Sequence, residues 1–94
     1  MELNVNPDSS PVNVPVFNCV VYLTKLERGV AARVANLDGI ELTGTDERDA
    51  LTRTVAAFKA LVQKHAENKS EIAWIDPIPD PKPGEQRQFV PVHL

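Results

Sequence analysis

Six carboxylates are the residues of this 94-residue chain with the clearest potential for chemistry, because clustered carboxylate oxygens bind divalent cations. Asp38 and Glu41 belong to a predicted turn and a half-exposed strand. Asp46 and Asp49 stand where a helix is predicted to begin, and acids stabilise that end of a helix. The other two acids are Glu71 and Asp76. We therefore expect no metal site, no cofactor and no catalytic residue.

The remaining reactive residue types give no catalytic pattern either. His65 and His93 are far apart in the sequence and have no metal-ligand spacing. The serines lie in predicted loops without the Gly-x-Ser-x-Gly turn that activates a nucleophile. Cys19 is the only cysteine, and it alternates with apolar residues, which favours a buried thiol over a reactive one. We expect a protein that is not an enzyme.

Composition and charge narrow the class of protein. Hydrophobic residues make up 43% of the chain and charged residues 24%, which is typical of one small globular domain. The net charge of -3 and the scattered Lys and Arg residues argue against direct nucleic-acid binding. No apolar run is long enough to cross a membrane, and the acidic N-terminus does not resemble a signal peptide. The expected location is the cytoplasm.

The first half of the chain predicts a leader followed by three strands. Residues 1–16 contain three prolines among polar residues and are predicted to be a flexible leader. Alternating apolar residues predict strands over 17–26 and 30–35, joined as a hairpin in which Lys25 pairs with Val30. The turn signal Asp38-Gly39 then introduces a third short strand over 40–43.

One amphipathic helix should follow these strands. Asp46 is a good N-cap, and Asp49 stands where a capping-box acid would stand. Apolar residues then recur at helical spacing, and they are Leu51, Val55, Phe58, Leu61, Val62 and Ala66. Asn68 is predicted to end the helix in a left-handed conformation.

The last part of the chain predicts one further strand and a proline-rich tail. Residues 71–76 read as a strand, and a strand that follows a helix usually returns parallel to an earlier one. Residues 77–94 form an extended tail that can add an edge strand over 87–93, because Pro91 cannot donate to a sheet ladder. This strand has two options: pairing with another chain, or pairing within this chain with the third strand.

Together these elements predict an α+β fold, a small mixed sheet in β-β-β-α-β order with one helix packed on one face. The order, with the Asp38-Gly39 turn and the segment Gly44-Thr45-Asp46-Glu47-Arg48-Asp49-Ala50-Leu51, resembles the HicB-like antitoxin family over residues 17–76. In that family a Gly-Asp-Thr-x-Glu-Glu-Ala-Leu motif opens the helix. This chain differs in its proline-rich segment, and we expect no DNA-binding module after the domain.

The resemblance implies a partial RNase H-like fold that binds and neutralises a small basic RNA-cleaving toxin of HicA type, usually as an oligomer, and it implies no catalysis. A nuclease of RNase H type would need an acid on the first strand, and residues 17–26 contain none. The alternative to an antitoxin is a stand-alone dimeric scaffold or small-ligand sensor.

The sheet face opposite the helix is the predicted binding surface. This face carries too many apolar residues to be merely solvated, and the chain has no second helix to cover it. We expect a protein partner there and on the C-terminal segment. The predicted partner-binding residues are Tyr22, Leu26, Arg33, Phe89, Val90 and Val92. The alternative is that the tail 77–94 covers this face itself.

Overall fold

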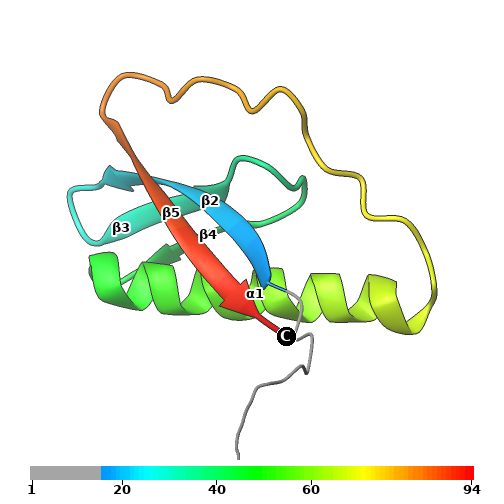
Figure 1. Ribbon diagram of the computed structural model, residues 1–94. Coiled ribbons are helices and arrows are strands. Elements are labelled where there is room, and N and C mark those ends of the chain that lie inside the picture. Colours follow the sequence, from blue (N-terminus) through cyan, green and yellow to red (C-terminus); the bar gives the residue numbers. More distant parts are fainter. Residues whose placement is uncertain (1–15) are drawn as a thin grey trace, which may run out of the picture.

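A computed structural model describes residues 16–94 as one antiparallel sheet with one helix packed against it (Figure 1). The leader predicted over 1–16 therefore lies outside the described residues, apart from its last position. The strands are β2 (Val16–Lys25), β3 (Val30–Val34), β4 (Glu41–Gly44) and β5 (Glu85–His93), and the helix α1 spans Glu47–Glu67. The spatial order of the strands is β4-β3-β2-β5. The predicted α+β class and the β-β-β-α-β order are confirmed.

The hairpin between β2 and β3 has the predicted register. Lys25 pairs with Val30, and the antiparallel pairing continues to Val21 opposite Val34. Gly29 closes the turn with φ of +102°, a conformation that a residue with a Cβ rarely adopts. This register places alternate residues of both strands on the face that meets the helix.

The predicted helix start is confirmed in its chemistry. Asp46 is the N-cap, and its Oδ1 accepts a hydrogen bond from the Asp49 backbone N–H at 2.8 Å. Asp49 Oδ2 accepts in return from the N–H of Thr45, at 2.8 Å, one residue before the cap. Gly44 lies so close to the helix that a Cβ there would be 2.5 Å from the backbone nitrogen of Ala50. The glycine and alanine of this segment therefore allow β4 to pack directly onto the first turn of α1.

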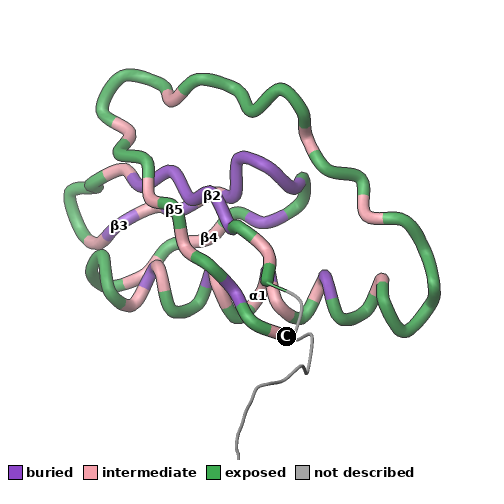
Figure 2. The backbone as a smooth tube through the Cα atoms, in the orientation of Figure 1, coloured by how far each residue is buried: buried purple, intermediate pink, exposed green. Residues whose placement is uncertain are grey.

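The helix covers one face of the sheet and forms the main core with it. Phe58, Val62 and Ala50 of α1 are almost fully buried against Cys19 and Val21 of β2 and their neighbours. Figure 2 shows the buried backbone concentrated in β2, β3 and the loop that follows β3, with buried positions of α1 on the side toward the sheet. The amphipathic stripe predicted for the helix is therefore the core stripe.

Two local predictions are wrong. Residues 71–76 do not form a strand parallel to an earlier one; Trp74 makes only an isolated antiparallel bridge to Leu37. The position beside β2 is taken by β5, which pairs with all of 16–24, so the sheet is antiparallel rather than mixed. Asn68 caps the helix in a right-handed conformation, and the left-handed residue is Lys69, with φ of 53°.

Residues 68–84 connect α1 to β5 and are here called the strap. Its first half packs against the helix layer, where the Trp74 ring lies 5.8 Å from the Phe17 ring and 5.9 Å from the Phe58 ring. The backbone N–H of Ile75 then donates to the carbonyl of Asn36, at 3.0 Å. The strap therefore runs from the end of α1 past the loop after β3 to the start of β5 (Figure 1).

The first testable prediction concerns the core. Phe58→Ala should lower the free energy of unfolding by about 3 to 5 kcal/mol, because it opens a cavity at a fully buried position. Gln63→Ala, at an exposed position of the same helix, is the control and should change it by less than about 0.5 kcal/mol. Urea unfolding of both variants measures this, and equal midpoints would contradict the assigned helix face.

Candidate functional site

The centre of the sheet face opposite the helix, here called the reverse face, is covered by the chain itself. Val20, Tyr22 and Ala35 form a second buried cluster there, with exposed fractions of 1 to 2%. The strap crosses this cluster, because the Tyr22 hydroxyl donates a hydrogen bond to the carbonyl of Pro79. The expectation of an uncovered reverse face is therefore wrong at its centre, and the alternative of a cover made by residues 77–94 is correct there.

Asn36 holds the loop after β3 against β2 and against the strap. Its Oδ1 accepts from the N–H of Val20 at 3.1 Å, and its Nδ2 donates to the carbonyl of Asn18 at 2.7 Å. β3 has ended before Asn36, so its side-chain amide takes the place of a neighbouring strand and satisfies these two backbone groups of β2. Sequence reasoning missed this residue, although a single Asn among the apolar residues Ala35 and Leu37 is a recognisable signal of a satisfied buried amide.

A bidentate ion pair fixes the other end of the strap to the sheet. Arg33 of β3 donates from Nε and Nη2 to the two carboxylate oxygens of Glu85, at 2.7 and 2.8 Å. Glu85 also accepts from the backbone N–H of Lys82, at 2.6 Å. The Arg33 guanidinium lies over the Tyr22 ring, 4.9 Å from its centre. These bonds hold the pKa of Glu85 at about 2, well below its ordinary value, and Arg33 is the largest cause.

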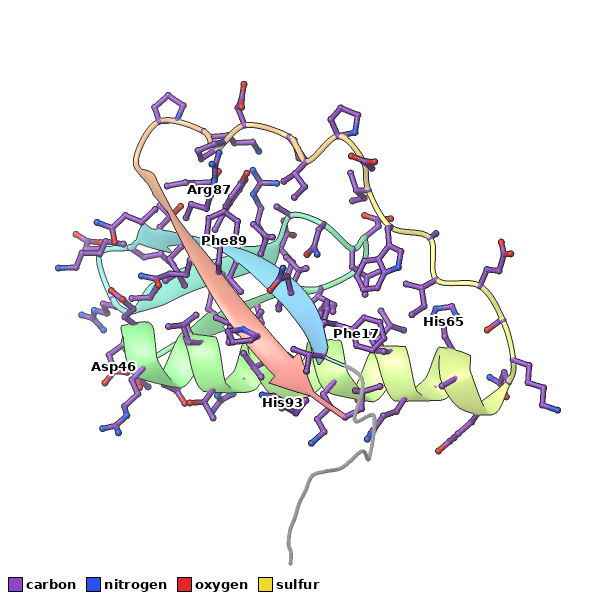
Figure 3. All side chains as sticks on the ribbon, viewed as in Figure 1. Phe17, Asp46, His65, Arg87, Phe89 and His93 are labelled. Atoms are coloured by element: carbon purple, nitrogen blue, oxygen red, sulfur yellow. The ribbon has the colours of Figure 1, made fainter. Side chains whose placement is uncertain are left out.

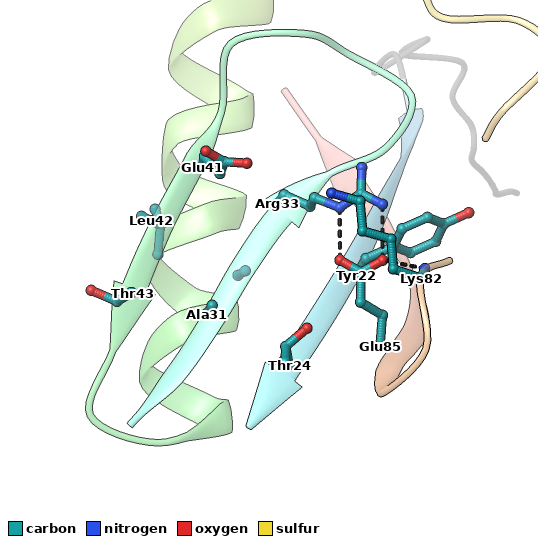
Figure 4. Close-up of a pocket in the computed structure, with 10 residues that line it drawn as sticks. Tyr22, Thr24, Ala31, Arg33, Glu41, Leu42, Thr43, Lys82 and Glu85 are labelled. Atoms are coloured by element: carbon teal, nitrogen blue, oxygen red, sulfur yellow. Dashed lines mark hydrogen bonds and ion pairs between the residues drawn. The ribbon is translucent and has the colours of Figure 1, made fainter. Parts of the chain in front are cut away.

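Beside this ion pair the reverse face stays open as a shallow hollow of about 400 Å³ over β3 and β4 (Figure 4). Small and polar side chains form much of its floor, and the ion pair and Tyr22 form the wall toward β5. Its lining includes Thr24, Ala31, Arg33, Glu41, Thr43, Lys82 and Glu85. A surface of this depth and mixed polarity can accept a protruding side chain of a partner or a small polar ligand.

The six predicted partner-binding residues fall into three groups. Tyr22 and Arg33 line the hollow, but Tyr22 is almost completely buried and Arg33 is already paired. Leu26 lies 44% exposed just beyond β2, and Phe89 on β5 is 61% exposed. The third group, Val90 and Val92 of β5, is described next.

Val90 and Val92 point to the helix side of the sheet. Val92 is 3% exposed within the main core, and Val90 packs against that core. Their side chains alternate with that of Phe89, so one strand cannot present all three on one face. In the described fold these two valines are core residues, which corrects their placement on a binding surface.

Phe89 and Arg87 form an exposed pair on the reverse side of β5 (Figure 3). The Arg87 guanidinium lies 5.9 Å from the centre of the Phe89 ring and 5.6 Å from that of Tyr22. Sequence reasoning missed Arg87 and Glu85, because their positions depend on the pairing of β5 with β2, which the predicted strand at 71–76 displaced.

Among residues 16–94 no group of three His, Cys, Asp or Glu side chains is close enough to hold a metal ion. Within the same range, no helix has the length and apolar character required to cross a membrane.

Comparison of this chain with protein-family models, with curated proteins and with solved structures gives no match.

The Arg33–Glu85 pair predicts a specific acid dependence. Because the pKa of Glu85 is lower in the folded protein than in the unfolded chain, its contribution is complete above about pH 5 and is lost as the pH falls toward 2. Between pH 5 and pH 2 the wild type should therefore lose more stability than Glu85→Gln, which cannot titrate there. Urea midpoints at several pH values measure this difference, and parallel pH profiles for the two proteins would disprove it.

Cys19 gives a further prediction. This residue lies on the face of β2 that meets the helix. The side chain is fully buried, and burial raises the pKa of its thiol to about 12. The folded protein should therefore fail to react with a disulfide reagent such as DTNB at pH 8, and the urea-unfolded chain should react completely. Rapid labelling of the native protein would show that β2 opens locally.

Proposed function

We propose that this protein is a non-catalytic protein-interaction module of HicB-like type, which neutralises a small basic RNA-cleaving toxin by steric occlusion of its RNA-cleaving surface. The observation that carries the proposal is the hollow on the reverse face over β3 and β4. The opposite face is covered by α1, so this hollow, beside the exposed Phe89 and Arg87 of β5, is a part of the sheet that the described chain leaves accessible.

The β4 side of the hollow suits a basic partner, since the cations Arg33 and Lys82 belong to the wall toward β5. Glu41 lies on its rim as an exposed carboxylate, and the chain as a whole carries a net charge of -3. Complementary charge speeds the encounter of two proteins and suppresses wrong partners. A Lys or Arg side chain entering the hollow on this side would meet Glu41 and Thr43, two residues apart on β4, and not the Arg33–Glu85 pair.

The resemblance that motivates the family assignment rests on the segment 44–51. In the structure this segment is where β4 ends against the first turn of α1, so its residues serve the packing of the two elements. The antiparallel β5 differs from the parallel strand expected after the helix. The family assignment therefore depends on the partner experiment below, and a cytoplasmic location belongs to the same proposal.

A small-ligand sensor is the second candidate, and the size of the hollow favours it. Sites for small molecules usually have volumes of about 300 to 1,000 Å³, and this one has about 400 Å³. Its lining offers hydroxyls, two carboxylates and two cationic side chains rather than an apolar cleft. A polar ligand with hydrogen-bond donors would match these groups.

The test of the proposed function is co-expression with a small basic RNA-cleaving protein encoded beside this one. The wild type should form a stable complex with it and restore growth of the host. Thr43→Arg should weaken the complex at least about tenfold, because the new side chain fills the hollow and adds a like charge against a basic partner. Isothermal titration with the purified proteins measures the change.

Thr52→Arg is the matched control, since it makes the same change at an exposed position of α1. It should bind as the wild type does, and both variants should melt within a few degrees of it. If Thr43→Arg and Thr52→Arg bind the partner equally well, the hollow is not part of the interface. Absence of any complex, together with a melting shift produced by a small polar ligand, would favour the sensor.

A further inference from the structure

The outer edge of β5 is the longest open strand edge among the described residues. The sheet ends in β4 on one side and β5 on the other, with lengths of four and nine residues. An open edge carries backbone N–H and C=O groups that have no sheet partner, and these groups can pair with another strand.

The hydrogen bonds around β2 show which residues of β5 face outward. Val20 directs its carbonyl to the N–H of Ala35 and its own N–H to Asn36, so even-numbered residues of β2 bond toward β3. Odd-numbered residues, such as Cys19, therefore bond toward β5. Since Cys19 pairs with Val90, the backbone N–H and C=O groups of the even-numbered residues of β5 bond to β2. The backbone groups of its odd-numbered residues point away from β2, toward the open edge.

The outward residues of β5 include Arg87, Phe89 and Pro91. Pro91 has no N–H, so its position on the outer edge costs the sheet no hydrogen bond, as expected for a proline in an edge strand. The N–H of Glu85 already donates to the carbonyl of Lys82, at 3.0 Å. Between the occupied Glu85 and Pro91, Arg87 and Phe89 are therefore the residues that offer both a donor and an acceptor to an incoming strand, and His93 ends β5 beyond the proline.

We propose that the outer edge of β5 pairs with β5 of a second copy of this chain, in an antiparallel register centred on Gln88. This proposal is independent of what binds in the hollow. In this register Arg87 of each copy forms a double hydrogen-bonded pair with Phe89 of the other, so the Arg87 and Phe89 positions of both copies are all used. A register centred on Phe89 would place Arg87 opposite Pro91, which cannot donate.

The side chains also complement one another in this register. Arg87 would lie opposite the 61% exposed Phe89 of the second copy, on the face where the two already approach each other within one chain. Gln88 would face itself across the two-fold axis, and an amide can both donate to and accept from an identical amide. Glu85 would lie opposite Pro91, so no like charges are directly opposed.

The experiment measures the oligomeric state of the full chain, residues 1–94, by analytical ultracentrifugation over a range of concentrations. The wild type should reach twice the chain mass. Phe89→Pro removes an outward N–H without touching the β2 ladder, and it should raise the dissociation constant by about tenfold or more. Pro91→Ala supplies a backbone N–H opposite Glu85 of the second copy and should lower the dissociation constant of the dimer. This variant is expected to fold, so it tests the edge independently of Phe89→Pro.

Cross-linking tests the register. Two residues facing each other without mutual hydrogen bonds have Cα atoms about 4.5 Å apart, within disulfide reach. Gln88→Cys should therefore oxidise to a covalent dimer much faster than Phe89→Cys, and the buried Cys19 supplies no competing thiol. Faster cross-linking at Phe89→Cys would overturn the register.

Two results would overturn the dimer itself. One is a wild-type monomer at all concentrations, and the other is a dimer that neither Phe89→Pro nor Pro91→Ala alters. In a monomer, hydrogen exchange would then show whether the amides of Arg87 and Phe89 are protected by pairing within the chain.

Discussion

The structure depends on the burial of both faces of β2. Residues Cys19 to Leu23 are buried without interruption, although successive side chains of a strand point to opposite faces. A strand of this kind needs a cover on each side, and it needs a hydrogen-bonded neighbour along each edge. The single helix can supply only one cover. The second cover, the strap, follows from this requirement.

The strap has little regular structure of its own, so side chains must attach it to the sheet. Asn36 and Trp74 fix its first half, Pro79 accepts from the buried hydroxyl of Tyr22, and Glu85 closes its end on Arg33. Prolines suit such a segment, because they reduce the conformational entropy that ordering would otherwise cost. The same attachments leave the strap over the centre of the sheet and away from β4, which is why the hollow lies where it does.

Local signals predicted what depends on neighbouring residues. The hairpin register followed from alternation and from Gly29, and the helix followed from Asp46 and its apolar stripe, because the forces involved act within a few residues. The choice between 71–76 and 85–93 as the partner of β2 is a competition over long distance in sequence. Both segments are extended and apolar in part, and the longer one wins because it matches β2 along its whole length.

The prediction of the binding site was wrong where it depended on which segment pairs with β2. With β5 beside β2, Val90 and Val92 turn to the helix, Glu85 reaches Arg33, and Phe89 with Arg87 remains outside. The continuous apolar run from Cys19 to Leu23 was a usable signal for a second cover, since strands buried on both faces lose their alternation. Once that cover is assigned to the strap, the accessible surface divides into a polar hollow over β3 and β4 and an open backbone edge on β5. The hollow opens from the reverse face, whereas the edge runs along the outer side of β5, at the end of the sheet away from β4.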